Sequence, residues 1–256
     1  MSGNPTHRLA LATAALCALS VASACAQEDA APDYSPAERL LFMTPQLQTL
    51  QPPTLLRYRF SRRGSLEEPF ADSVTLALNA RADGGCCAAR GTFLSAARRL
   101  PVPDVPQAEG NPVILYFLEH DMREMQRLTQ GAQRHFRKRL RLAIQQGGVV
   151  RDVTLPYQGQ GVVGQEIVLS PFLDDPLRPK YEKFARKSYR FLLSAAVPGG
   201  LYGIRTRIPG EDPQARPLLV EELLIEGAGA MDGSWNGHPP PEEEGATNLA
   251  ATRQTP

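Results

Sequence analysis

The feature that most constrains the fold is a change of hydrophobic period along the chain. In residues 54–60, TLLRYRF, apolar side chains alternate with arginines, which is the pattern of a half-buried β-strand. Residues 72–80, DSVTLALNA, repeat that pattern. The same reasoning predicts six further strands, within residues 86–97, 149–157, 162–172, 187–197, 201–208 and 217–226.

Short turns join these segments, and no crossover helix separates neighbours within either run. Residues 198–200, PGG, lie between two alternating segments and are a strong hairpin signal. Consecutive strands joined in this way pair antiparallel, whereas parallel pairs need a long crossover. The order of elements therefore predicts an α+β fold with a largely antiparallel sheet.

The helical segments carry recognisable start signals. Ser35 is a candidate N-cap, followed by Pro36 in the first turn and Glu38 at the capping-box position. A longer helix is expected from Asn111, with Leu115, Leu118, Met122 and Met125 on its apolar face, and it should break near Gly131. A second segment is expected over residues 132–146. We expect this helix pair to pack on one side of the sheet.

The two ends of the chain differ from its body. Residues 1–26 combine a basic start, an uncharged apolar run and small residues at Ala24 and Ala26, as secretory signal peptides do. Residues 227–256 are rich in Gly, Pro and acidic residues and predict a disordered tail. One domain over residues 27–226 and a periplasmic location follow. The alternative is a lipid anchor on Cys25, within ASAC.

The order of elements resembles the bacterial periplasmic lipoprotein-carrier architecture. The resemblance rests on an exported chain with an N-terminal amphipathic helix, a strand meander and helices on one side, and on no shared motif. It implies a curved sheet that holds acyl chains against a helical lid. The residues expected to line such a concavity, with ordinary core packing as the alternative, are Leu56, Tyr58, Phe60, Leu76, Phe191 and Leu193.

Basic residues are concentrated in RHFRKRLRLAI, residues 134–144, although the whole chain has a net charge of only +1. On a helix, Phe136, Leu140 and Ile144 form an apolar stripe. Four basic residues share another face at i, i+3, i+4 and i+7, and we call them the basic ridge: Arg134, Arg137, Lys138 and Arg141. The ridge has three possible roles: a solvated face, a contact with an anionic lipid surface, or a contact with an acidic protein partner. Export excludes nucleic acid.

Catalytic and cofactor motifs are absent from the sequence. It contains no G-x-S-x-G, no H-E-x-x-H and no phosphate-binding loop. His120 and Glu124 share a helix face but are too few for a zinc site, so no metal or cofactor is expected. His120 is expected on the polar face, and Asp174 and Asp175 are read as turn formers.

Two pairs of neighbouring residues are candidates for chemistry. Glu221 and Glu222 should point to opposite faces of the last strand, so they cannot act as one carboxylate pair. Cys86 and Cys87 are candidates for a disulfide or a redox role, with a local turn feature as the alternative.

The sequence thus favours an exported, non-enzymatic binding or carrier protein for an apolar ligand or a lipidated client. The alternative is an accessory interaction protein that uses the basic ridge against an acidic partner or an anionic membrane. An enzyme would require a pocket in which Glu221 or Glu222 meets His120 or another polar group.

Overall fold

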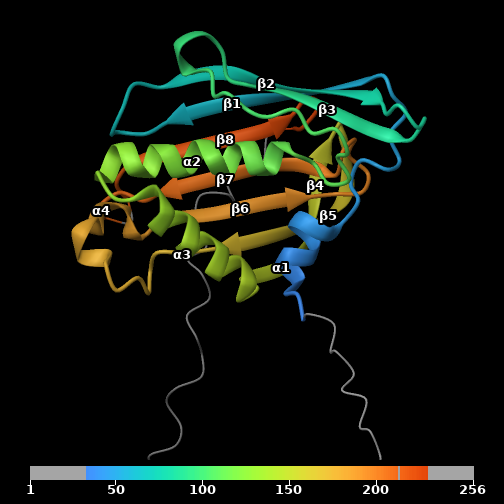
Figure 1. The fold of residues 1–256 in the computed structure, drawn as a ribbon. Helices are drawn as coiled ribbons and strands as arrows, with labels where there is room; N and C mark the ends of the chain where they lie inside the picture. The colour runs from blue at the N-terminus through green and yellow to red at the C-terminus, as the bar shows by residue number, and fades with distance from the viewer. Residues whose placement is uncertain (1–32, 213, 230–256) are drawn as a thin grey trace, which may run out of the picture. The chain divides into compact units, whose positions relative to one another are not determined.

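The computed structural model describes residues 33–212 and 214–229, and within them the chain forms one eight-stranded antiparallel sheet. The strand order is β3-β2-β1-β8-β7-β6-β5-β4 (Figure 1). All eight predicted strand segments are confirmed. Their bounds are β1 Thr54–Arg63, β2 Phe70–Ala80, β3 Cys86–Phe93, β4 Val149–Tyr157, β5 Gln160–Leu169, β6 Ser188–Leu193, β7 Leu201–Ile208 and β8 Leu219–Ile225.

The sheet consists of two meanders joined by its first and last strands. β1 to β3 form one run and β4 to β8 the other, and β1 pairs with β8 from Tyr58↔Ile225 to Arg63↔Val220. The predicted hairpin between β6 and β7 is confirmed by their antiparallel pairing. The β1–β8 pair joins the two runs into one sheet, although its residues lie far apart in the sequence.

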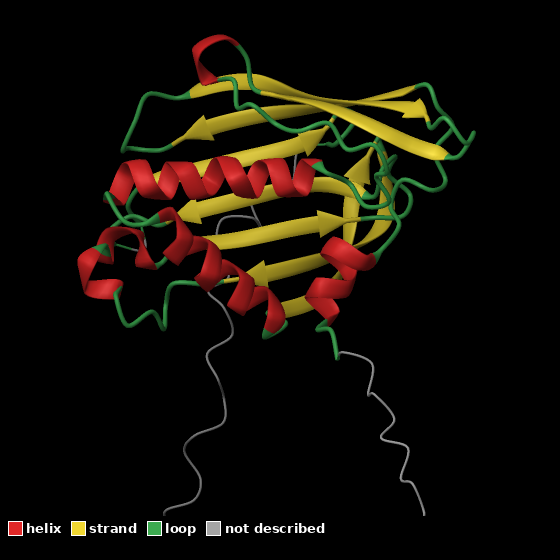
Figure 2. Cartoon of the chain, viewed as in Figure 1, coloured by secondary structure: helices red, strands yellow, loops and turns green. Residues whose placement is uncertain are grey.

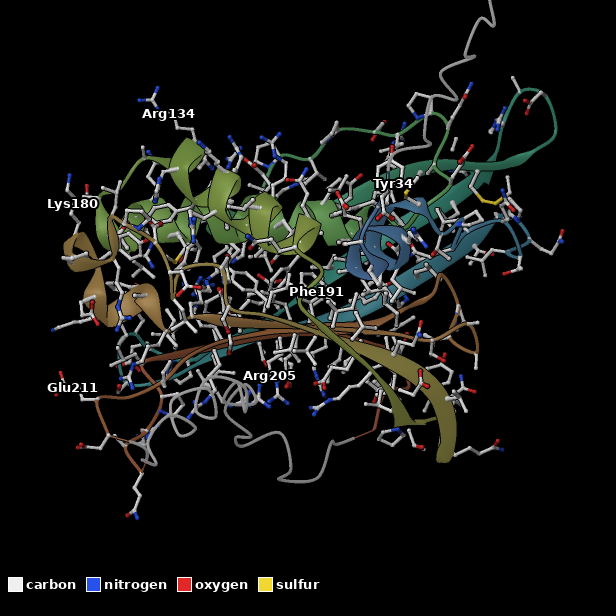
Figure 3. The ribbon with its side chains drawn as sticks, turned by 90° about the horizontal axis from the view of Figure 1, so that it is seen from below. Tyr34, Arg134, Lys180, Phe191, Arg205 and Glu211 are labelled. Atoms are coloured by element: carbon white, nitrogen blue, oxygen red, sulfur yellow. A yellow bond between two sulfur atoms is a disulfide. The ribbon has the colours of Figure 1, made fainter. Side chains whose placement is uncertain are left out.

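Helices precede and interrupt the strands. Figure 2 shows the strands as one sheet with the main helices in front of it, and Figure 3 shows these helices and Arg205 on opposite sides of the sheet. The helical segments are α1 Pro36–Glu38, which continues as the π-helical turn η1 Arg39–Met43, then η2 Ala96–Arg98, α2 Val113–Thr129, α3 Gln133–Gln145, η3 Arg178–Lys180 and α4 Glu182–Ala185.

The predicted capping box of α1 is confirmed. The Glu38 backbone N–H donates to Ser35 Oγ at 3.1 Å, and the Ser35 N–H donates to Glu38 Oε2 at 3.0 Å. Ser35 Oγ also donates to the carbonyl of Ile144 at 2.7 Å. Ile144 lies in the last turn of α3, so this bond fixes the N-terminal helix to the end of α3.

The start and end of α2 also agree with its sequence signals. Asn111 Oδ1 accepts from the Val113 N–H at 3.1 Å, so Asn111 caps the helix start as predicted. At the other end, Gln130 has a left-handed conformation with φ 57°, and the helix stops there rather than at Gly131. A left-handed residue at this position turns the chain out of the helix.

The orientation of α3 is as predicted. Phe136, Leu140 and Ile144 are buried, whereas all four residues of the basic ridge are exposed. The Phe136 ring meets the rings of Phe172 and Tyr181 edge-on, with centroids 5.6 and 5.4 Å apart. The apolar stripe therefore fixes α3 to the fold and turns the ridge outwards.

The orientation of α2 differs from the prediction. Leu118, Met122 and Met125 are buried, but Leu115 is 57% exposed. The buried surface of α2 also includes His120 and Asp121, which are polar. A prediction that assigns polar residues to the solvent side places the apolar face wrongly when part of the core is itself polar.

The described chain continues beyond the predicted domain end at residue 226. Ala228 forms a bridge with Tyr157, and the Gly229 N–H donates to the carbonyl of Pro156 at 2.8 Å. The predicted signal peptide, Cys25 and the remainder of the predicted tail lie outside the described residues. Within the described ranges, none of the helices has the length and hydropathy needed to cross a bilayer.

We predict that Phe136→Ala lowers the free energy of unfolding by about 3–5 kcal/mol, because it empties a buried aromatic site. Urea denaturation followed by circular dichroism measures the change. The matched control is Lys138→Ala on the exposed side of the same helix, which should change stability by less than about 0.5 kcal/mol. Equal effects of the two substitutions would mean that α3 is oriented the other way.

Candidate functional site

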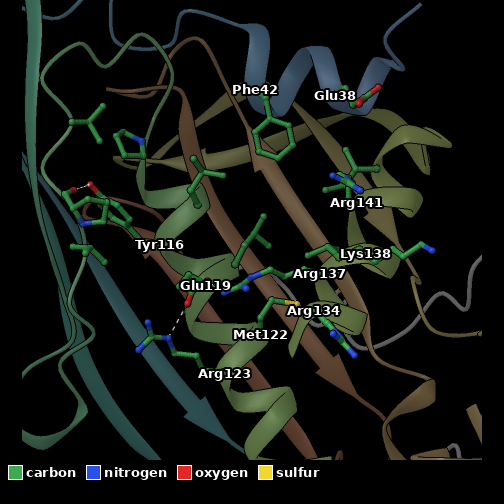
Figure 4. Close-up of a pocket in the computed structure, with 18 of the residues that line it drawn as sticks. Glu38, Phe42, Tyr116, Glu119, Met122, Arg123, Arg134, Arg137, Lys138 and Arg141 are labelled. Carbon is green, nitrogen blue, oxygen red and sulfur yellow. Dashed lines mark hydrogen bonds and ion pairs between the residues drawn. The ribbon is translucent and has the colours of Figure 1, made fainter. Parts of the chain in front are cut away.

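An open groove lies on the helical side of the protein, between α2 and α3. The η1 residue Phe42 and residues 101–105, which follow β3, border its other sides (Figure 4). The cavity has a volume of about 920 Å³. This size falls within the range of roughly 300–1,000 Å³ that is typical of small-molecule sites.

The interior of the groove is apolar. Leu118 and Met122 of α2 face Leu140 and Ile144 of α3 across it. These pairs are spaced four residues apart on their helices, so each pair lies along one helix face. Leu115, the exposed residue that departed from the prediction, lies along the same groove. Leu118, Met122, Leu140 and Ile144 are buried and form the floor of the groove, whereas Leu115 and Phe42 are exposed beside it.

The basic ridge forms the rim of this groove. Arg134, Arg137, Lys138 and Arg141 all line it, and Figure 4 shows them along α3. Among the described residues, only Arg137 of these four has an ion pair, with Glu119 of α2 at 2.5 Å. The other three side chains present their charge to solvent at the groove.

Glu119 links the two helices that border the groove. It also accepts from Arg123 on its own helix at 2.9 Å. Burial raises the pKa of the Glu119 carboxyl, but its hydrogen bonds and charge contacts with Arg137 and Arg123 outweigh this and hold the pKa below its usual value. Glu119 therefore stays ionised at neutral pH and keeps the two helices aligned.

This combination of surfaces determines what the groove can bind. An apolar chain would be removed from water in the interior, which is favourable in proportion to the area buried. A carboxylate or phosphate attached to that chain would meet the ridge at the rim, where cations form charge-assisted hydrogen bonds. The groove therefore suits an amphipathic molecule with a negative head.

A buried ionic cluster lies beneath α2, on its side facing the sheet. Asp121 accepts hydrogen bonds from Lys187 Nζ and, at 2.6 Å, from Tyr189 Oη. All three side chains are fully buried. Burial raises the pKa of Asp121, and Lys187 and Tyr189 oppose that effect only in part. Buried charges need such partners, so Lys187 and Tyr189 hold this turn of α2 on the sheet.

A second buried cluster centres on Glu221 of β8. Its Oε1 lies 3.0 Å from Arg62 Nε and 3.1 Å from His120 Nε2. The His120 ring also packs against Phe60 and Phe93, at centroid distances of 5.4 and 5.3 Å. Burial raises the pKa of Glu221, but His120, Lys187 and Arg62 outweigh it and hold the pKa well below its ordinary value.

Glu221 and His120 meet, which is the contact that an enzyme interpretation requires. Both side chains are buried, however, and neither lines the groove. The prediction that His120 lies on a polar, solvated face is wrong, because its partners come from β1, β3 and β8. We therefore interpret the pair as an anchor of α2. Glu222 points to the other face of the sheet, as predicted, and lies 3.9 Å from Arg63.

The six residues expected to line a concavity of the sheet are all buried in the core. Figure 3 shows Phe191 in the layer between the helices and the sheet. Only Leu193 also borders a described pocket, a separate one beside β5. These six residues are Leu56, Tyr58, Phe60, Leu76, Phe191 and Leu193. Their packed side chains fill the space that a ligand inside the sheet would need.

The remaining candidate residues form a disulfide or contacts with neighbouring side chains and backbone. Cys86 and Cys87 are joined by a disulfide at the start of β3, with Cys87 buried and Cys86 partly exposed. Asp175 is buried and is more than a turn former. Its Oδ1 accepts from the Leu177 N–H at 2.8 Å, and its Oδ2 lies 2.5 Å from His135 Nε2. In the described ranges, no group of three or more His, Cys, Asp or Glu side chains is placed to hold a metal ion.

Lys187→Met should lower the free energy of unfolding by about 3–5 kcal/mol, because it leaves Asp121 buried without its cation. The double variant Lys187→Met with Asp121→Leu removes both charges and should recover most of that loss. Urea titrations of the single and double variants provide the measurement. If the single variant loses less than about 1 kcal/mol, Asp121 does not anchor α2.

Comparison with models of known protein families finds no match for this chain, and comparison with curated protein sequences finds none either. No residue role is therefore carried over from a relative. The function proposed below rests on the groove, on the charge at its rim and on the buried contacts that fix its walls.

Proposed function

We propose that this is a non-enzymatic binding or carrier protein for an amphipathic anionic ligand. The ligand's apolar chain lies between α2 and α3, and its negative group meets the basic ridge. The observation that carries the proposal is that all four ridge residues line one apolar groove. A solvated face needs no apolar surface beside its charges, and a purely apolar ligand needs no charges.

The energetics fit a ligand with both parts. Ten buried methylene groups contribute about 8 kcal/mol. Association costs at least roughly 4 kcal/mol, so the apolar part alone gives an affinity near the millimolar range. Contacts with Arg134, Lys138 and Arg141 supply the remainder and make the affinity sensitive to salt.

In this proposal the sheet is a support and the ligand lies outside it. The curved sheet, with the helices packed on its one side, holds α2 and α3 at a fixed separation. The ligand class includes a free fatty acid and the acyl chain of a lipidated client. The proposal retains the periplasmic location expected from residues 1–26, and the resemblance to lipoprotein carriers agrees with an acyl ligand.

We expect the folded protein to enhance the fluorescence of a hydrophobic dye and a medium-chain fatty acid to displace that dye. Leu115→Glu should weaken the displacement constant of the fatty acid at least about tenfold, which corresponds to about 1.4 kcal/mol. It places a negative charge at the groove, where the ligand's own negative group is held.

The matched control for this titration is Val163→Glu. Val163 is also an exposed apolar residue, 78% accessible, but it lies on β5 and does not line the groove. This control should bind dye and fatty acid like the unaltered protein. Absence of dye enhancement, or equal weakening by both substitutions, would contradict binding in the groove.

A second candidate function is docking of the same face on an anionic membrane surface. Exposed apolar residues border the ridge, namely Phe42 of η1, 42% accessible, and Leu115 of α2. Basic residues near an anionic bilayer contribute about 1 kcal/mol each, and neighbouring apolar side chains can enter the interface. A carrier of acyl ligands would gain direct access to its ligand in this way.

Lys138→Glu combined with Arg141→Glu should reduce co-sedimentation with vesicles that contain anionic lipid several-fold at low salt. Thermal stability should remain nearly unchanged, since both side chains are exposed. The control, Lys180→Glu with Lys183→Glu, makes the same change of charge at exposed positions away from the groove. Unaltered sedimentation of the ridge variant would exclude membrane docking through this face.

A further inference from the structure

The face of the sheet opposite the helices carries a pocket of different chemistry. Its volume is about 400 Å³, and four arginines line it: Arg63 of β1, Arg205 and Arg207 of β7, and Arg216 of the segment before β8. Figure 3 shows Arg205 pointing away from the helical layer. The pocket is therefore separate from the groove between α2 and α3.

Among the described residues that line this pocket, four are arginines and none is acidic. Glu222 lies 3.9 Å from Arg63 and 4.0 Å from Arg205, which is the outer limit of an ion pair. Within the described part of the chain, Arg207 has no ion pair. Burial lowers the pKa of Arg205 to about 10, and like charges including Arg63 act in the same direction against Glu222. An anion with several charges would relieve this repulsion.

The described chain ends beside the strand that carries two of these arginines. Tyr202 Oη of β7 donates to the carbonyls of Pro156, at 2.8 Å, and Gly229, at 3.4 Å. Arg205 and Arg207 follow Tyr202 by three and five residues, or about 10 and 17 Å along an extended strand. The described chain therefore ends beside β7, the strand that carries Arg205 and Arg207.

We propose that the arginine pocket binds the acidic segment Glu242–Glu244 of the same chain. Three successive carboxylates match the excess of guanidinium groups, and arginine forks bind carboxylates in pairs of hydrogen bonds. Glu242 lies thirteen residues beyond Gly229, and thirteen residues of random-coil chain span about 20 Å root-mean-square. The span is comparable with the distance of about 17 Å from Tyr202 to Arg207 along β7, so the segment can reach the pocket at a high effective concentration.

A tethered segment is a better occupant than a free small anion on these grounds. A free anion loses all of its translational freedom when it forms the same contacts. The tethered segment loses less, because the chain already restricts its position. Binding through exposed charges also weakens as salt screens them, with a screening length of about 8 Å at physiological ionic strength.

The single tryptophan of the chain provides a direct probe, because Trp235 lies between Gly229 and Glu242. We expect the fluorescence anisotropy of Trp235 in the full chain to be high at low salt and to fall as salt rises. Glu242→Gln, Glu243→Gln and Glu244→Gln together should lower it at low salt to the high-salt value. Arg207→Gln with Arg216→Gln should do the same from the side of the pocket.

The matched control is Lys138→Gln with Arg141→Gln, which removes two charges from the groove side and should leave the anisotropy unchanged. Since the tail variant alters nothing in the described domain, its result does not depend on the folding of the arginine variant. Equal anisotropy of the unaltered chain and the tail variant at low salt would overturn the proposal. Inorganic phosphate whose binding is lost in Arg207→Gln with Arg216→Gln, and which leaves the anisotropy of the unaltered chain unchanged, would also overturn it by assigning the pocket to a free anion.

Discussion

The position of α2 depends on buried charge as much as on apolar packing. Asp121 is held by Lys187 and Tyr189, and His120 is held by Glu221, itself paired with Arg62. A buried ion without a partner costs several kcal/mol, so α2 cannot rotate without losing these contacts. Fixing the side of α2 that faces the sheet also fixes the side that faces α3. The apolar wall of the groove follows from that choice.

Much of the fold could be predicted from the sequence because local patterns determine it. Alternation in residues such as Leu56, Tyr58 and Phe60 marks a strand wherever one face is buried, and short turns restrict neighbouring strands to antiparallel pairing. The orientation of α3 was also predictable, since Phe136, Leu140 and Ile144 form an uninterrupted apolar stripe on an otherwise polar helix.

The groove was not predictable, for a physical reason. The helix pattern of α2 contains His120 and Asp121, whose partners Glu221 and Lys187 lie 101 and 66 residues away in the sequence. No local pattern indicates such pairs, so the sequence places His120 on the polar face and Leu115 in the core. The groove further requires segments from four parts of the chain. The one sequence feature that pointed to the groove was the basic ridge, which lies on its α3 wall.

We propose that the ligand lies between α2 and α3, outside the packed core, with its negative group at the ridge. Photo-crosslinking with a diazirine-bearing fatty acid, followed by mass spectrometry of peptides, tests it most directly. We expect labels within residues 113–122 and 140–145, and we expect them to be lost when excess unlabelled fatty acid is added. Saturable labelling confined to β1, β6 or β8 would place the ligand in the sheet interior and contradict the account.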